Sequence, residues 1–128
     1  MKVLLDTHVF LWALLEPDKL SPRVRGLLED DATEVVVSSA TAWEIATKLR
    51  LGKLTGAKPV VADYAAALHG LQAVELAMTG EHALQAGAWD VPHRDPFDRM
   101  LAAQSKLEKL ALVSCDPAME PFGVELIW

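Results

Sequence analysis

The sequence predicts an α/β sandwich built around a mainly parallel sheet. Short apolar runs of strand length alternate along the chain with segments of helical periodicity, the pattern of strands joined by crossover helices. The 128 residues, 52% of them hydrophobic and 23% charged, suit one domain spanning residues 1–128. No repeat, low-complexity tract or linker divides the chain, and its single cysteine excludes an intrachain disulfide.

The first third of the chain predicts one strand and two helices. The apolar run Lys2 to Leu5 is typical of a buried strand. A helix follows from Thr7 to Glu16 and is stopped by Pro17. Because this helix is apolar nearly all round, we expect it to be buried or covered by a partner. Ser21-Pro22 supplies a hydroxyl cap and a first-turn proline to a second helix, which leads to the acidic pair at 30–31.

The middle third repeats the order of strand and helix. Three consecutive valines within Glu34 to Val37 predict the second strand. We expect a helix capped by Ser39 and ending near Leu51, with Gly52 as its C-terminal stop. Pro59 to His69 has the apolar spacing of a helix, and Leu71 to Leu76 predicts a third strand.

The last third adds two helices and two strands. Thr79 to Trp89 predicts a helix, and a polar loop then leads to another helix that starts at Pro96. Leu110 to Cys115 predicts the fourth strand, and Val124 to Trp128 a final edge strand. In parallel sheets, functional residues gather at the carboxyl ends of the strands.

Four acidic residues stand beside expected strand ends or helix starts. Asp6 ends the first strand, Asp116 follows the fourth, and Asp98 lies in the first turn of the helix from Pro96. Glu44 lies about one and a half turns into the helix after the second strand. A parallel sheet can bring all four to one rim, where such carboxylates must share a cation or protonate. Oxygen ligands alone favour Mg²⁺ or Mn²⁺.

Each acid, taken singly, also has a purely structural interpretation. Asp6 can cap the first helix, and Asp98 can complement the dipole of its own helix. Glu44 stands four residues before Lys48, the spacing of a surface ion pair, and Asp116 can open a turn. Their joint placement at one rim favours a functional site.

Four runs of the sequence match known motifs: LLDTHVFLW (Leu4–Trp12), SSATAWEIATK (Ser38–Lys48), HRDPFDRMLAAQ (His93–Gln104) and LVSCD (Leu112–Asp116). In this order and spacing the chain resembles PIN-domain ribonucleases, in particular the VapC-type toxins of toxin–antitoxin pairs. The resemblance implies a PIN-like three-layer α/β/α sandwich over residues 1–128. It also implies a Mg²⁺- or Mn²⁺-dependent endoribonuclease, a homodimer, and a cognate antitoxin protein as partner.

The resemblance carries the catalytic and metal-binding roles onto Asp6, Glu44, Asp98 and Asp116. Asp6 and Asp98 are expected as the principal ligands, and Asp95 as a helix cap or a support. Attack by a metal-activated water predicts RNA products with a 5′-phosphate and a 3′-hydroxyl. The Ser114 hydroxyl is expected within reach of a neighbouring acid.

The charge distribution bears on how RNA is held. Twelve basic and 18 acidic side chains give a net charge of −6, which argues against a simple nucleic-acid binder. However, the stretch 47–62 contains four basic residues and no acid. We expect Lys48, Arg94 and Arg99 to contact substrate phosphate, although a solvated helix end also explains the basic stretch.

Other residues carry structural expectations. Trp43 and Trp89 lie within helical apolar patterns and are expected in the core. His82 is expected at the surface, and His93 is expected to order its loop or to touch substrate.

Two other functions are considered. A catalytically inert PIN-like binding module would keep the fold and use the acids structurally. A receiver-type signalling domain would need a phosphoacceptor aspartate after the third strand, where Leu76-Ala77-Met78 stands instead. The sequence contains neither a secretion signal nor about 18 consecutive apolar residues, so we expect a cytoplasmic protein that does not enter a membrane.

Overall fold

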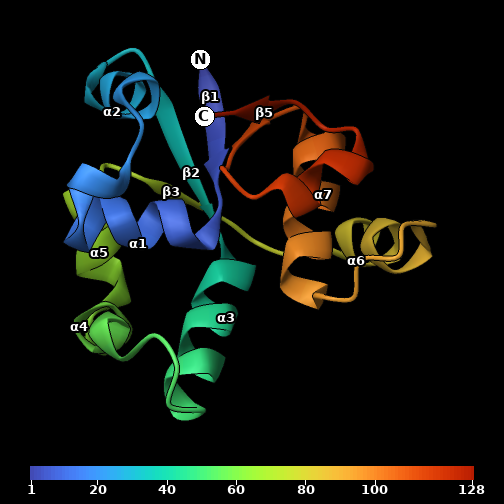
Figure 1. Cartoon of the computed structure of the whole chain (residues 1–128), viewed down its shortest axis with the longest axis horizontal. Helices are drawn as coiled ribbons and strands as arrows, with labels where there is room; N and C mark the ends of the chain where they lie inside the picture. Colours follow the sequence, from blue (N-terminus) through green and yellow to red (C-terminus); the bar gives the residue numbers. More distant parts are fainter.

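The computed structural model describes all 128 residues, and five parallel strands form its single sheet (Figure 1). The strand order is β3-β2-β1-β4-β5, so the first strand of the chain lies in the middle. The strands are β1 (Lys2–Leu5), β2 (Glu34–Ser38), β3 (Val74–Leu76), β4 (Ala111–Val113) and β5 (Leu126–Ile127). The predicted parallel sheet and its final edge strand are confirmed.

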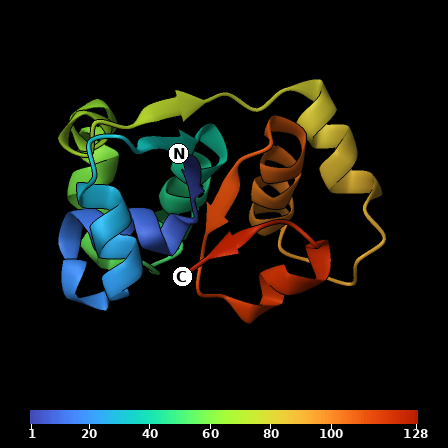
Figure 2. The same cartoon turned by 90° about the horizontal axis from the view of Figure 1, so that it is seen from above.

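Helices cover both faces of this sheet and complete three α/β/α layers. The α-helices are α1 (Thr7–Leu15), α2 (Pro22–Glu29), α3 (Ser39–Arg50), α4 (Lys58–Ala62), α5 (Tyr64–Gly70), α6 (Gly80–Ala88) and α7 (Pro96–Glu108). Three 3₁₀ helices, η1 (Pro17–Lys19), η2 (Thr55–Ala57) and η3 (Pro117–Phe122), link them. Helices α1, α2 and α5 lie on one side of the sheet, and α6 and α7 lie on the other (Figure 2).

The alternation of side chains along β1 creates the two cores. Val3 and Leu5 pack with buried residues of α1 and α2 in the larger core, and Leu4 packs with Leu101 of α7 in the smaller one. Successive strand residues point to opposite faces, so a strand buried on both sides is apolar throughout. This explains why the sequence shows continuous apolar runs rather than alternation.

Local cap residues account for the differences from the predicted boundaries. Ser38, not Ser39, caps α3, and its hydroxyl accepts a hydrogen bond from the Ala40 amide at 3.0 Å. The helix predicted over 59–69 is divided into α4 and α5 at Asp63, whose carboxylate accepts the Ala66 amide at 3.0 Å. Strand β3 starts later than predicted because Gln72 turns the chain with a φ of 52°.

None of the helices combines the length and the apolar character that crossing a bilayer requires.

Candidate active site

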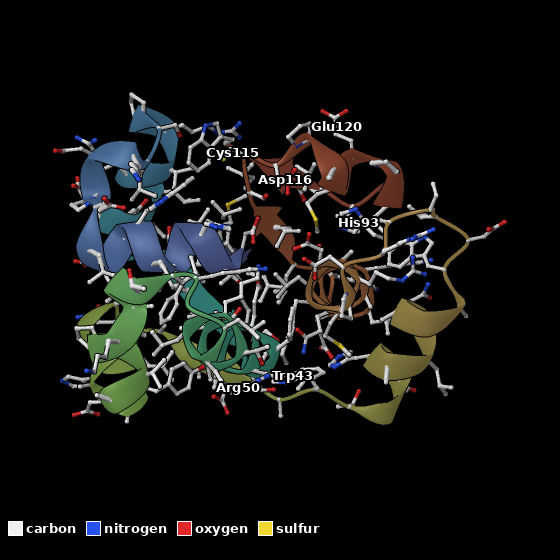
Figure 3. The ribbon with its side chains drawn as sticks, turned by 60° about the horizontal axis from the view of Figure 1, so that its bottom comes forward. Trp43, Arg50, His93, Cys115, Asp116 and Glu120 are labelled. Atoms are coloured by element: carbon white, nitrogen blue, oxygen red, sulfur yellow. The ribbon has the colours of Figure 1, made fainter.

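The carboxyl ends of the central strands bring distant parts of the sequence together. Asp6 follows β1, and its amide donates to the Val113 carbonyl of the neighbouring β4 at 3.0 Å. The Ser114 hydroxyl then donates to Asp6 Oδ2 at 2.6 Å, joining residues 108 positions apart. Figure 3 views the molecule with this end of the sheet brought forward. The strand order therefore fixes the position of Asp6.

Asp6 is a buried carboxylate without a capping role. It stands at the N-cap position of α1 and is 6% exposed, but its side chain makes no cap hydrogen bond. The structure thus excludes the interpretation of Asp6 as a helix cap. Burial raises the pKa of Asp6, the hydrogen bond from Ser114 opposes this rise, and the charge of Glu44 adds to it.

Glu44 lies even deeper, at 2% exposure. Its Oε1 accepts the Thr7 hydroxyl at 2.5 Å, and its Oε2 pairs with the ammonium of Lys48 one helical turn later. The predicted i,i+4 pair exists, but it is not the surface pair of the structural interpretation, because one partner is buried. Burial acts to lower the pKa of Lys48, and the hydrogen bond and charge of Glu44 outweigh it, so this pKa is raised.

Asp98 projects from the first turn of α7. Its Oδ2 lies 2.9 Å from Nε2 of His93, within hydrogen-bond distance. Burial raises the pKa of Asp98 to about 6; the His93 contact opposes the rise, and the charges of Asp95, Asp6 and Glu44 add to it. The helix is capped by Asp95 instead, which accepts the amides of residues 97 and 98. The expectation of Asp95 as a helix cap is confirmed.

Asp116 differs from the other acids in being exposed. Its carboxylate accepts the Ala118 amide at 2.9 Å and caps η3, as the structural interpretation predicts. Its own amide donates to the Ser114 hydroxyl at 3.1 Å. Ser114 therefore links the segment that carries Asp116 to the carboxylate of Asp6.

The three cationic residues expected to bind phosphate differ in what their side chains contact. Lys48 is paired with Glu44, and Arg94 is exposed without a hydrogen bond to the protein. Arg99 does not match the expectation of a phosphate ligand. Its guanidinium donates to the carbonyl oxygens of residues 86, 89, 91 and 93, which occupies four of its five N–H donors. Arg99 thus anchors the loop between α6 and α7.

The donor set suits a hard divalent cation. The charge of Glu44 raises the pKa of both Asp6 and Asp98, and the charge of Asp6 also raises that of Asp98. The three carboxylates therefore lie within electrostatic reach, and all offer oxygen ligands. No group of three or more His, Cys, Asp or Glu side chains is close enough, as placed here, to hold a metal ion. The positive charge among the acids is the ammonium of Lys48, which Glu44, Asp95 and Asp98 all attract.

The burial of Trp43 and of His82 was predicted wrongly, and the hydrogen bond between Thr7 and Glu44 was not predicted. Trp43 is 55% exposed rather than in the core, because it lies just outside the helical arc that faces the sheet. His82 is buried rather than at the surface, since Thr79 and Glu108 hydrogen-bond its ring. Thr7, which holds Glu44, was missed, and its position directly after Asp6 was the available signal.

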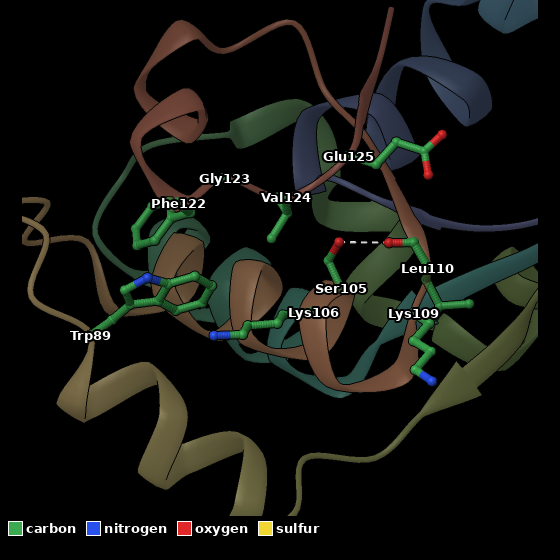
Figure 4. Close-up of a pocket in the computed structure, with 9 residues that line it drawn as sticks. All are labelled: Trp89, Ser105, Lys106, Lys109, Leu110, Phe122, Gly123, Val124 and Glu125. Atoms are coloured by element: carbon green, nitrogen blue, oxygen red, sulfur yellow. Dashed lines mark hydrogen bonds between the residues drawn. The ribbon is translucent and has the colours of Figure 1, made fainter.

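A separate pocket of about 420 Å³ lies between α7 and the C-terminal segment, and none of the four acids lines it (Figure 4). The Ser105 hydroxyl donates to the Leu110 carbonyl at 2.6 Å in its wall. The Lys106 ammonium lies 5.1 Å from the centre of the Trp89 ring, a cation–π contact. This pocket does not belong to the acidic site.

Comparisons with solved structures agree on the fold. VapBC2 from Rickettsia felis, solved bound to a DNA fragment from their promoter, has a chain similar to this one at a TM-score of 0.69 and 14% identity, covering 99% of this chain and 98% of that one. FitAcB from Neisseria gonorrhoeae gives a TM-score of 0.62 and 20% identity over 100% and 97% of the chains. VapBC-1 from nontypeable Haemophilus influenzae gives a TM-score of 0.61 and 15% identity, covering 99% of this chain and 97% of that one.

None of the curated proteins compared with the chain matches it in sequence. The PIN domain family does match, over residues 3–123. This range includes all four acids, all of β2, β3 and β4, and β1 except for Lys2. With its all-parallel sheet and covered faces, the chain belongs to the PIN domain family.

Proposed function

We propose that the chain is a Mg²⁺- or Mn²⁺-dependent endoribonuclease whose cation is held by Asp6, Glu44, Asp98 and Asp116. The observation that supports this most directly is the burial of carboxylates near one another without a capping role. Asp6 makes no cap contact although it stands at an N-cap, and Asp98 leaves the capping of α7 to Asp95. Carboxylates that are buried and repel one another are costly unless a positive charge joins them.

The chain's own residues position these acids. Ser114 orients Asp6, Thr7 orients Glu44, and His93 orients Asp98, each by a side-chain contact. A bound Mg²⁺ or Mn²⁺ supplies charge neutralisation at the scissile phosphate and lowers the pKa of a water ligand. Lys48 balances Glu44 in the metal-free protein, and Arg94, being exposed, is available to an RNA phosphate.

The test is RNA cleavage with end analysis. We expect divalent-dependent products bearing a 5′-phosphate and a 3′-hydroxyl, because water rather than the 2′-hydroxyl attacks. Asp6→Asn and Asp98→Asn are expected to lose cleavage and saturable Mn²⁺ binding in calorimetry. Asp31→Asn, an exposed acid outside the site, is the matched control and keeps both. Products with 2′,3′-cyclic phosphate ends would contradict the mechanism.

We further propose that the protein is the toxin of a toxin–antitoxin pair and acts as a homodimer. The proposal is supported by the similarity of fold to chains of VapBC2, VapBC-1 and FitAcB. The apolar helix α1 leaves Leu15 exposed, and the net charge of −6 suits a basic partner segment. Light scattering on the purified chain tests the dimer: the mass of a single chain at micromolar concentration would contradict it.

The inert binding module is the second candidate. It is favoured by the absence of three acids close enough for a cation and by the Glu44–Lys48 pair, which a purely structural site would also show. The two candidates differ in the effect of Asp98→Asn. An enzyme loses cleavage and keeps its melting temperature, whereas a structural acid lowers the melting temperature and no metal binds up to millimolar concentration.

A further inference from the structure

A pair of aromatic rings, one exposed and one half-buried, flanks the acidic site. Trp43 of α3 is 55% exposed, and its ring centre lies 4.8 Å from that of Phe97 in α7, with an interplanar angle of 80°. Each ring directly precedes a proposed metal ligand, Trp43 before Glu44 and Phe97 before Asp98. The pair therefore joins the two helices that carry these acids.

The edge-to-face contact fixes the indole while leaving much of it in water. Tryptophan is the largest apolar side chain and is highly buried on average, so the exposed face of this indole offers a large apolar surface to a ligand. A ring held by its neighbour loses little freedom when a flat ligand stacks on it. The surface is thus preorganised for another planar group.

The surrounding charge indicates what that group is. Arg50 lies seven residues after Trp43, on the same face of α3, and Figure 3 shows both on the opposite side of this rim from Asp116. The segment from 47 to 62 continues from this helix and contains no acid. Its Lys48 is paired with Glu44, and its three other basic residues, Arg50, Lys53 and Lys58, are exposed. Aromatic rings interleaved with cations are the usual arrangement for single-stranded nucleic acid, whose bases stack while its phosphates meet the cations.

We propose that Trp43, held by Phe97, stacks on an unpaired base of the RNA next to the phosphate that the acids address. This rests on the proposed ribonuclease function and assigns to Trp43 the contact by which the site holds an unpaired base. A base inside a duplex offers no free face to a side chain, so paired RNA is not held at this surface. A second copy of the chain covering Trp43 is the competing occupant.

The test measures RNA binding separately from cleavage. In an Asp98→Asn background, a 12-nucleotide single-stranded RNA of mixed sequence is titrated into the protein, and the same RNA annealed to its complement is titrated in parallel. Stacking of one base predicts that Trp43→Ala weakens single-strand binding by about 5- to 150-fold. Trp43→Phe keeps a ring and is expected to restore most of the loss. Leu84→Ala removes an apolar side chain that is 76% exposed on α6, and it should change nothing.

Cleavage by the active protein adds a second readout. Trp43→Ala is expected to raise KM for single-stranded RNA much more than it lowers kcat, because it removes binding and leaves the acids in place. The proposal is overturned if Trp43→Ala binds single strands as tightly as the parent. It is also overturned if the variant changes the sedimentation of the protein while RNA binding per chain stays the same, which identifies a protein interface. Failure of the parent itself to bind or cleave any RNA instead removes the ribonuclease function, and the base site with it.

Discussion

Replacing Arg99 by methionine is expected to destabilise the protein strongly. The guanidinium donates to the carbonyls of Ala86, Val91 and His93 at 2.7–2.9 Å and also to that of Trp89. Ala86 and Trp89 lie at the C-terminal end of α6, where carbonyls have no partner within the helix. Helix α6 has no basic residue in its own last turn, so the cation of Arg99 also complements its dipole.

The size of the effect follows from the burial of the four acceptors. A hydrogen bond to a charged group stabilises by about 1.5–3 kcal/mol, and we assign this to the carbonyl of buried Ala86. The other three acceptors belong to half-buried residues and can bind water after the substitution, so each counts for roughly 0.5–1 kcal/mol. The expected loss is roughly 4 kcal/mol. This is a large share of the free energy of unfolding of a typical domain, which is about 5–15 kcal/mol.

Urea unfolding followed by circular dichroism measures this loss. Arg99→Met should lower the midpoint and leave the slope unchanged, because the exposed surface on unfolding is the same. Arg94→Met, five residues earlier and exposed, is the control and should stay within about 0.5 kcal/mol of the parent. Arg99→Lys should recover only part of the loss, since a point ammonium cannot reach four carbonyls. Equal stability of Arg99→Met and Arg94→Met would refute the role of the guanidinium as the anchor of the loop.

Three further perturbations test the site. Asp98 has a pKa of about 6 in the folded protein, against 3.8 for the unperturbed carboxyl group. Between these two pH values the folded state binds more protons than the unfolded state. The metal-free protein should therefore gain thermal stability as the pH falls from 7 to 5. Asp98→Asn should flatten that gain, and an identical pH profile for the two proteins would contradict the assignment. Ser114→Ala should cost about 1–3 kcal/mol in urea unfolding by leaving Asp6 without its donor, whereas Ser114→Thr keeps the hydroxyl and should cost less. Asp95→Ala should cost about 1 kcal/mol as a lost N-cap of α7, and a neutral result in the same assay would show that the cap contributes nothing.

The sheet could be predicted from the sequence because its strands are buried on both faces. Lys2–Leu5 and Glu34–Ser38 are continuous apolar runs that end at polar residues, and such runs leave few alternatives to parallel strands. The positions of Asp6 and Ser114 then follow from the strand order, since neighbouring parallel strands end at the same edge. This is why residues at the strand ends were found without any knowledge of distances.

The surroundings of two helical side chains, Trp43 and Arg99, could not be predicted in the same way. Trp43 belongs to an apolar helical pattern, but the buried arc of α3 covers Ala40, Glu44 and Ile45 and stops short of it. Arg99 stands beside Asp98 in the sequence, yet the irregular path of the loop before α7 brings carbonyls to its guanidinium. No periodicity describes the path of such a loop, so the acceptors of Arg99 were invisible in the sequence.

The central position of β1 has a consequence for when the site can exist during synthesis. Asp6 leaves the ribosome early, but its partner Ser114 lies 108 residues later, beyond the strand that pairs with β1 on that side. Until Ala111–Val113 has emerged and paired, the middle strand is an open edge, and the rim lacks both Ser114 and Asp116. Contacts this distant in sequence form slowly because a long loop must close first. The proposed site therefore stays incomplete until the segment through Asp116 has emerged and folded.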